Sequence, residues 1–137
     1  TIVQEQMELI AKSKHQNNVQ LHYSHEYSCE NEPFKQAYLA RNFDSKLYPD
    51  ITKMCDENPT DVFGQVQPVP ECNLFVTGTS CKDFSMLKGK RKDIEDAGTS
   101  GITFMAAVDI IMQQQPQCCI LENVMGAPWD KMSEYIT

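Results

Sequence analysis

The sequence predicts an α/β fold of the doubly wound, Rossmann-like type. Stretches with apolar residues at helical spacing alternate with short apolar stretches of strand character, and polar residues follow the predicted strands. Helices that alternate with strands indicate a parallel sheet covered on both faces. Ligands of such sheets bind beyond the carboxyl ends of the strands, so functional residues are expected there.

The first half of the chain contains two predicted helices and two predicted strands. Residues 2–14 have the apolar spacing of an amphipathic helix, and alternating side chains predict a strand over residues 19–26. Pro33 suits the first turn of the next helix, and a short strand is expected around residues 47–48. The expected buried face of this second helix comprises Phe34, Ala37, Tyr38 and Arg41 through its stem.

The second half contains two further strands with a helix between them. Residues 74–76 predict a short buried strand, and residues 118–121 predict a continuous apolar one. Residues 102–111 predict a largely buried helix. The stretches 54–72 and 82–100 are polar or proline-rich and are expected to be loops, and long loops in compact domains are usually functional or mobile.

Composition and length indicate one globular domain over residues 1–137. No apolar run reaches the roughly 18 to 20 residues that cross a bilayer, so no membrane span is expected. The six cysteines form no CxxC pair, and Cys118-Cys119 lies in an apolar run that is expected to be buried. An intracellular protein with reduced cysteines fits this pattern better than a secreted disulfide scaffold. The three histidines have no zinc-finger spacing, so no metal is expected.

The net charge of −7 does not suggest a protein that binds nucleic acid, but the charge is unevenly distributed. Five of the twelve basic residues follow Cys81 closely. They are Lys82, Lys88, Lys90, Arg91 and Lys92. The run is either a solvated loop or a surface for phosphate groups.

Two acidic residues after predicted strands are candidates for binding a nucleoside. Glu30 lies where doubly wound folds bind the two hydroxyls of a ribose, or it is a carboxylate that only stabilises a helix N-terminus. Asp50 can accept a hydrogen bond from an exocyclic amine such as that of adenine, with Ile51 packing on the ring.

Cys81 and Glu122 are the candidates for chemistry. Cys81 lies at a strand-to-loop turn, where backbone amides and Lys82 favour a thiolate; alternatively it is a buried structural cysteine. Glu122 ends an apolar strand, where partial desolvation would favour its protonated form; alternatively it simply reaches water. A thiolate and a carboxylic acid that face one pocket suit nucleophilic addition to an electron-poor ring.

These segments together resemble the cytosine-5 DNA methyltransferase family, from about residue 19 to 129. Residues 29–38 resemble its second motif, and Asp50-Ile51 falls at the adenine-binding pair of its third. Residues 78–85, Gly-Thr-Ser-Cys-Lys-Asp-Phe-Ser, are similar to the nucleophile motif, which is usually Gly-x-Pro-Cys-Gln-x-Phe-Ser. Residues 122–124 match its Glu-Asn-Val motif.

The resemblance implies a role for each candidate. Cys81 would add to C6 of a flipped cytosine in DNA, and Glu122 would hold its N3/N4 edge and donate a proton. S-adenosylmethionine would supply the methyl group, with Glu30 at its ribose and Asp50 and Ile51 at its adenine. Asn31 stands where some members place an aromatic residue on the cofactor. The expected DNA contacts are Ser85, Lys88, Lys90, Arg91 and Lys92. Such an enzyme is expected in the nucleus.

The departures from the family pattern are also informative. Thr79-Ser80 replaces the usual residue-Pro pair and Lys82 replaces the glutamine, a form that resembles a divergent fungal-type branch. The glycine-rich first motif and the later motifs are not found, so the methyltransferase sheet is expected to be incomplete, lacking its first strand and its C-terminal part. That strand would lie between those at 19–26 and 74–77. We therefore expect a piece of a longer protein that is inactive alone.

Three other functions remain open from the sequence. A tRNA cytosine-5 methyltransferase would share the fold, and a regulatory or scaffold homologue would keep the fold without activity. A thiol hydrolase built on Cys81 would need a histidine partner, but all three histidines precede the end of the first predicted strand.

Overall fold

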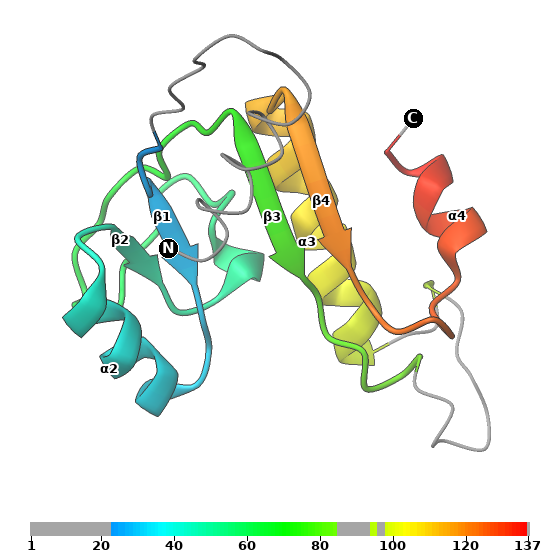
Figure 1. Cartoon of the computed structure of the whole chain (residues 1–137), viewed down its shortest axis with the longest axis horizontal. Coiled ribbons are helices and arrows are strands. Elements are labelled where there is room, and N and C mark those ends of the chain that lie inside the picture. The colour runs from blue at the N-terminus through cyan, green and yellow to red at the C-terminus, as the bar shows by residue number, and fades with distance from the viewer. Residues whose placement is uncertain (1–22, 85–93, 96–97, 137) are drawn as a thin grey trace, which may run out of the picture.

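The computed structural model describes residues 23–84, 94–95 and 98–136. The predicted helix over residues 2–14 lies outside these ranges. The elements are β1 (Tyr27–Cys29), α2 (Pro33–Asn42), β2 (Lys46–Tyr48), the 3-10 helix η1 (Ile51–Lys53), β3 (Leu74–Gly78), α3 (Gly98–Gln114), β4 (Cys118–Glu122) and α4 (Trp129–Glu134) (Figure 1).

The four described strands form two parallel pairs, so the predicted parallel pairing is confirmed. β1 pairs with β2 from Tyr27↔Lys46 onward, and β3 pairs with β4 from Leu74↔Cys118 to Gly78↔Glu122. Each pair is a separate two-stranded sheet within the described residues. Helices and strands alternate along the chain, and the result is a mixed α/β arrangement with short parallel strands.

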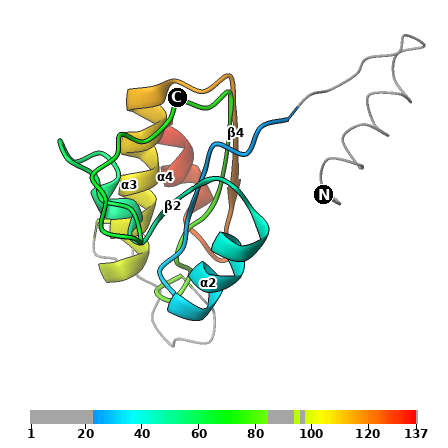
Figure 2. The ribbon, with the colours of Figure 1, turned by 90° about the vertical axis from the view of Figure 1, so that its left-hand side faces the viewer.

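Helix α3 joins the two strand pairs into one core. Ala107 and Ile110 on α3 are buried in a cluster with Phe75 of β3 and with Tyr48 and Met54 from the other half. Figure 2 shows α3 along one side of the strands. Burial of a side chain such as that of Ile110, Phe75 or Met54 contributes roughly 1.5 to 3 kcal/mol, so α3 fixes how the two halves meet.

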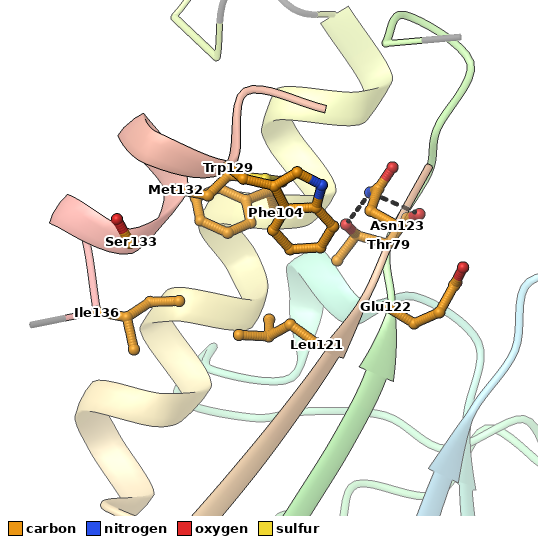
Figure 3. A pocket seen from close by; sticks show the side chains of 9 residues that line it. All are labelled: Thr79, Phe104, Leu121, Glu122, Asn123, Trp129, Met132, Ser133 and Ile136. Carbon is orange, nitrogen blue, oxygen red and sulfur yellow. Dashed lines mark hydrogen bonds between the residues drawn. The ribbon is translucent and has the colours of Figure 1, made fainter. Parts of the chain in front are cut away.

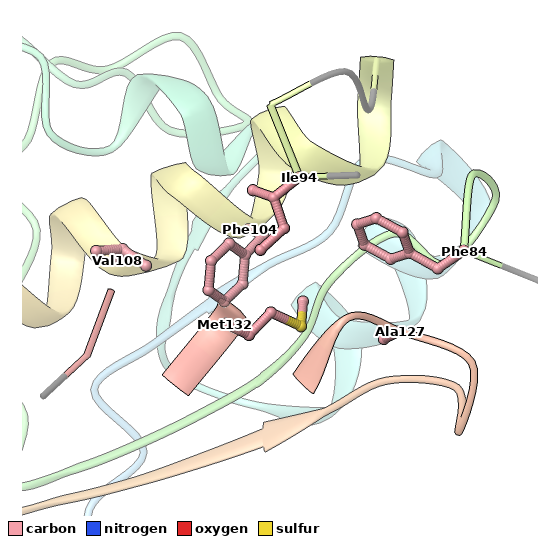
Figure 4. Close-up of a cluster of buried hydrophobic side chains, with 6 residues drawn as sticks. All are labelled: Phe84, Ile94, Phe104, Val108, Ala127 and Met132. Carbon is pink, nitrogen blue, oxygen red and sulfur yellow. The ribbon is translucent and has the colours of Figure 1, made fainter. Parts of the chain in front are cut away.

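A second cluster fixes the segment that follows Cys81. Its buried members are Phe84, Ile94, Phe104, Val108, Ala127 and Met132 (Figure 4). The Phe84 side chain is fully buried there, and its backbone N–H donates to the Cys81 carbonyl at 3.1 Å. The cysteine turn is therefore attached to the core on its carboxyl side.

Two predictions for the first half need correction. The strand begins at Tyr27, because residues 23–26 are not in a strand, and residues 19–22 lie outside the described part. Helix α2 has the predicted start at Pro33, but none of its residues is buried: Phe34 is 71% and Tyr38 64% exposed. Apolar spacing reports only which face could be buried, and within the described residues no layer covers this face.

The predicted burial of the second half is also wrong in part. Cys118 is exposed, Ile120 is 47% exposed, and Val76 beside it is 61% exposed. Alternate side chains of a strand point to opposite faces, and within the described residues α3 covers one face of this pair while the other stays open. Ile102 is likewise 58% exposed although α3 contributes seven buried residues, and α3 begins at Gly98 within the predicted loop.

Candidate functional site

The register of β3 and β4 brings the two predicted catalytic segments together. Gly78 is paired with Glu122, and Cys81 follows three residues after Gly78. A Cβ added at Gly78 would lie 3.0 Å from Glu122 Oε2, so a side chain at position 78 would press against this carboxylate. The glycine before the nucleophile turn therefore allows Glu122 to lie across the end of β3.

Asn123 bridges the ends of the two strands. Its Nδ2 donates to Thr79 Oγ1 at 3.0 Å and to the Thr79 carbonyl at 3.3 Å (Figure 3). Its Oδ1 accepts the Val124 N–H at 2.8 Å. Both ends of the amide are therefore used. The sequence placed Asn123 in a motif, but gave no indication of this structural bridge.

Asn123→Ala is expected to loosen the Cys81 turn by breaking this bridge. Loss of side-chain hydrogen bonds in a half-buried site costs about 1 to 2 kcal/mol, which corresponds to roughly 5- to 30-fold more frequent local opening. The rate of backbone hydrogen exchange of residues 79–84 in the full-length protein measures this local opening. Asn73→Ala is the matched control, since Asn73 is exposed and its backbone carbonyl, which accepts from Cys118 N–H, is kept. Equal exchange in both variants would contradict the bridge.

The four predicted cofactor residues line one cavity together with Cys81. This cavity has a volume of about 900 Å³ and runs between β1 and β3 along the whole length of both strands. One end of it lies beyond the carboxyl ends of β1 and β2. Glu30, Asn31, Asp50 and Ile51 lie on its wall. The structure thus brings together five residues that the sequence singled out separately.

Both acidic candidates also stabilise their own backbone. Glu30 Oε1 accepts the Glu32 N–H at 2.9 Å just before α2, and its Oε2 lies 3.8 Å from Lys35 Nζ. Asp50 Oδ1 accepts the N–H and the hydroxyl of Thr52 at 2.9 and 2.8 Å, which caps η1. A carboxylate has about four lone-pair sites, so each group retains acceptor capacity for a ligand.

Two other thiols, those of Cys29 and Cys72, also line the cavity, and Cys29 is held neutral. Desolvation, followed by the charges of Asp50 and Glu30, raises the pKa of Cys29 to about 12. Tyr27 at the same wall also stays neutral, because burial and the neighbouring Cys72 raise its pKa well above its ordinary value. A neutral thiol is a poor nucleophile, so Cys29 is a poor candidate for that role.

The environment of Glu122 differs from the predicted one. Partial desolvation was expected, but Glu122 is exposed, since the face of β4 that carries it is open within the described residues. Leu121 and Asn123 on the other face line a smaller cavity of about 220 Å³, whose wall includes Phe104 and Trp129 (Figure 3). Glu122 also contributes to this wall, but its carboxylate points away from the apolar side chains (Figure 3).

The predictions for DNA binding, cysteine state, metal binding and membrane spans concern parts of the chain beyond this site. The predicted DNA contacts Ser85, Lys88, Lys90, Arg91 and Lys92 lie outside the described residues. All six cysteines are described and are free thiols. Groups of three or more potential metal ligands are not found among the described residues, and no described helix is long and apolar enough to cross a membrane.

The class of the protein follows from a match to a known family. Residues 10–132 match the C-5 cytosine-specific DNA methylase family, and the chain belongs to this family. The resemblance inferred from the ordered motifs is therefore confirmed.

Particular relatives narrow the class further. The chain is 41% identical over 132 residues to the DNA (cytosine-5-)-methyltransferase DMT5 of Cryptococcus neoformans, covering 94% of the chain and 6% of the relative. It is 27% identical over 164 residues to DMT5 of Verticillium dahliae, covering 82% of the chain and 7% of the relative. A third match, the orphan methyltransferase M.Rho11sI of Bacillus phage rho11s, is 38% identical over 69 residues, 47% of the chain and 13% of the relative. The two long matches are fungal, as the Thr-Ser-Cys form predicted, and the chain spans only a small part of each.

Proposed function

We propose that the protein containing this chain transfers a methyl group from S-adenosylmethionine to C5 of cytosine in DNA. The observation that carries the proposal is the joined end of β3 and β4. There Asn123 ties the Cys81 turn to the segment of Glu122, next to the cavity that holds the four cofactor candidates.

The chemistry assigns one task to each of the two catalytic candidates. The Cys81 thiolate forms a bond to C6 of a cytosine flipped out of the duplex, and this makes C5 electron-rich. Glu122 donates a proton at the N3 edge and so offsets the charge that develops on the ring. C5 would take the methyl group, whose bond to the sulfur of the cofactor breaks and leaves a neutral thioether. Transfer of the C5 proton to a water-borne base would then re-form the C5–C6 double bond and release Cys81 as thiolate, while N3 returns its proton to Glu122.

The cavity suits a nucleoside-containing methyl donor. Ribose hydroxyls donate hydrogen bonds to carboxylates, which fits Glu30, while an adenine amine fits Asp50 and an apolar side chain beside its ring fits Ile51. Asn31 borders the same space. When bound there, S-adenosylmethionine supplies an electrophilic methyl group beside the Cys81 turn.

The doubly wound sheet is part of this proposal. Within the described residues, β1 and β3 each have one edge without a neighbouring strand, and α3 packs under both strand pairs. A further parallel strand would satisfy the backbone groups at these edges and fill the part of the cavity that runs along them, leaving the end at the cofactor candidates for a ligand. We infer that this strand comes from outside the described residues. The basic residues at 88–92 would contact DNA phosphates, and a DNA substrate places the protein in the nucleus.

A trapping experiment tests the function. The full-length protein is incubated with S-adenosylmethionine and duplex DNA that contains 5-fluorocytosine, whose fluorine blocks the final elimination. A covalent protein–DNA adduct at Cys81 is expected, and none without the cofactor. The same experiment with tRNA tests the RNA alternative. No adduct from folded, DNA-binding protein would contradict the proposal and support a regulatory or scaffold homologue.

A further inference from the structure

We propose that four residues around the start of α3 position the Cys81 turn for reaction. This set, called the α3 clamp, consists of Ser80, Asp83, Ser100 and Thr103. Thr103 accepts the backbone N–H of Ser80, and the Ser80 hydroxyl also lies 3.4 Å from that of Ser100. The inference rests on the proposed function in that it assigns a positioning role within the same reaction.

The first half of the clamp is a reciprocal pair between Asp83 and Ser100. The Asp83 N–H donates to Ser100 Oγ at 2.9 Å, and the Ser100 N–H donates to Asp83 Oδ2 at 3.2 Å. Both residues are buried, with exposed fractions of 8% and 0%. The first N–H groups of a helix lack partners within the helix, so Asp83 caps α3 while Ser100 holds the backbone two residues after Cys81.

The second half of the clamp joins Ser80 to Thr103. The Ser80 N–H donates to Thr103 Oγ1 at 3.2 Å. The Thr103 hydroxyl donates in turn to the carbonyls of Thr99 at 2.9 Å and Ser100 at 3.2 Å. Its hydrogen is thus used within the helix, which directs a lone pair of Oγ1 toward Ser80.

The two halves hold the backbone on both sides of Cys81. Ser80 precedes the cysteine by one residue and Asp83 follows it by two, and both are bonded to the first two turns of one helix. Helix α3 is itself fixed in both buried clusters. The clamp therefore transmits the rigidity of the core to the position of the thiol, and a displacement of about 1 Å at a reacting group can cost roughly 100-fold in rate.

The clamp also accounts for the residue that stands at position 80. The family pattern has proline there, whose ring fixes φ and which has no N–H. Ser80 leaves φ free but supplies the N–H that Thr103 accepts. We infer that in this chain the bond from Ser80 to Thr103 does the restraining that a proline ring would do.

The inference is tested in the full-length protein with a rescue design. Thr103→Val keeps the shape of the side chain but removes the hydroxyl that accepts the Ser80 N–H. It is compared with Thr103→Ser and with the double variant Ser80→Pro/Thr103→Val. The control is Met112→Ala, since Met112 is exposed on the same helix. Thr103→Val is expected to lower kcat about tenfold while KM for DNA and cofactor stays within about twofold. The double variant is expected to regain most of the lost rate, and Thr103→Ser to keep most of it.

Hydrogen exchange of residues 79–84 provides a readout that does not depend on catalysis. The exchange rate should rise in Thr103→Val, return to the wild-type rate in the double variant and stay unchanged in Met112→Ala. Unchanged kcat and exchange in Thr103→Val, or a double variant as slow as Thr103→Val, would overturn the clamp. If the wild-type protein has no activity, the proposed function fails, and exchange alone then decides whether the clamp holds this turn.

Discussion

Cys81→Ser is expected to abolish methyl transfer, with a loss of more than about a thousandfold, because a serine hydroxyl is far less nucleophilic than a thiolate at neutral pH. The covalent adduct with 5-fluorocytosine DNA should disappear as well. Binding of DNA and cofactor should persist, since the substitution changes one atom. Transfer of a labelled methyl group by the full-length protein measures the loss.

Cys118→Ser is the matched control for this variant. Cys118 is an exposed free thiol at the opposite end of β4 from Glu122, so its replacement should leave the rate unchanged. Cys29 lines the same cavity as the cofactor candidates and would be an unsuitable control. Methyl transfer by Cys81→Ser at the wild-type rate, or an adduct on another cysteine, would contradict the assignment of the nucleophile.

The strand ends were predictable from the sequence because they depend on local patterns. Short apolar stretches bounded by glycine, proline or polar residues indicated β2, β3 and β4, and parallel pairing then placed the turn of Cys81 and Glu122 at the ends of paired strands. The structure places Cys81 in the larger cavity and Glu122 in the smaller one, so the expectation that both face one pocket is not met. The exposure of α2 and of Cys118 to solvent was not predictable in this way. Which face of an element is covered depends on what packs there, and apolar spacing alone carries no such information.

The residues that hold the site were harder to recognise than those that react. Thr103 and Ser100 are ordinary small polar residues within a helix, and their roles depend on a turn about 20 residues earlier in the chain. The one signal in the sequence was the replacement of proline by Ser80, which frees a backbone donor. The backbone N–H of Ser80 needs a hydrogen-bond acceptor, but only the structure identifies that acceptor as Thr103.

Glu122→Gln is expected to lower kcat by about 100- to 1,000-fold, because the amide keeps the shape of the side chain but cannot deliver the proton. Affinity for DNA should change little. Glu71→Gln, at an exposed position before β3, is the matched control. Single-turnover methyl transfer with saturating DNA and cofactor separates the chemical step from binding.

The exposure of Glu122 decides how this result should appear. Within the described residues the protein leaves the carboxylate in contact with water, so a flipped base would have to displace that water for the acid to act. The loss is therefore expected in the chemical step with DNA bound, and the stability of the free protein should be unaffected. A rise in KM with unchanged kcat would show instead that Glu122 only binds the base, and the proton would then have to come from another group.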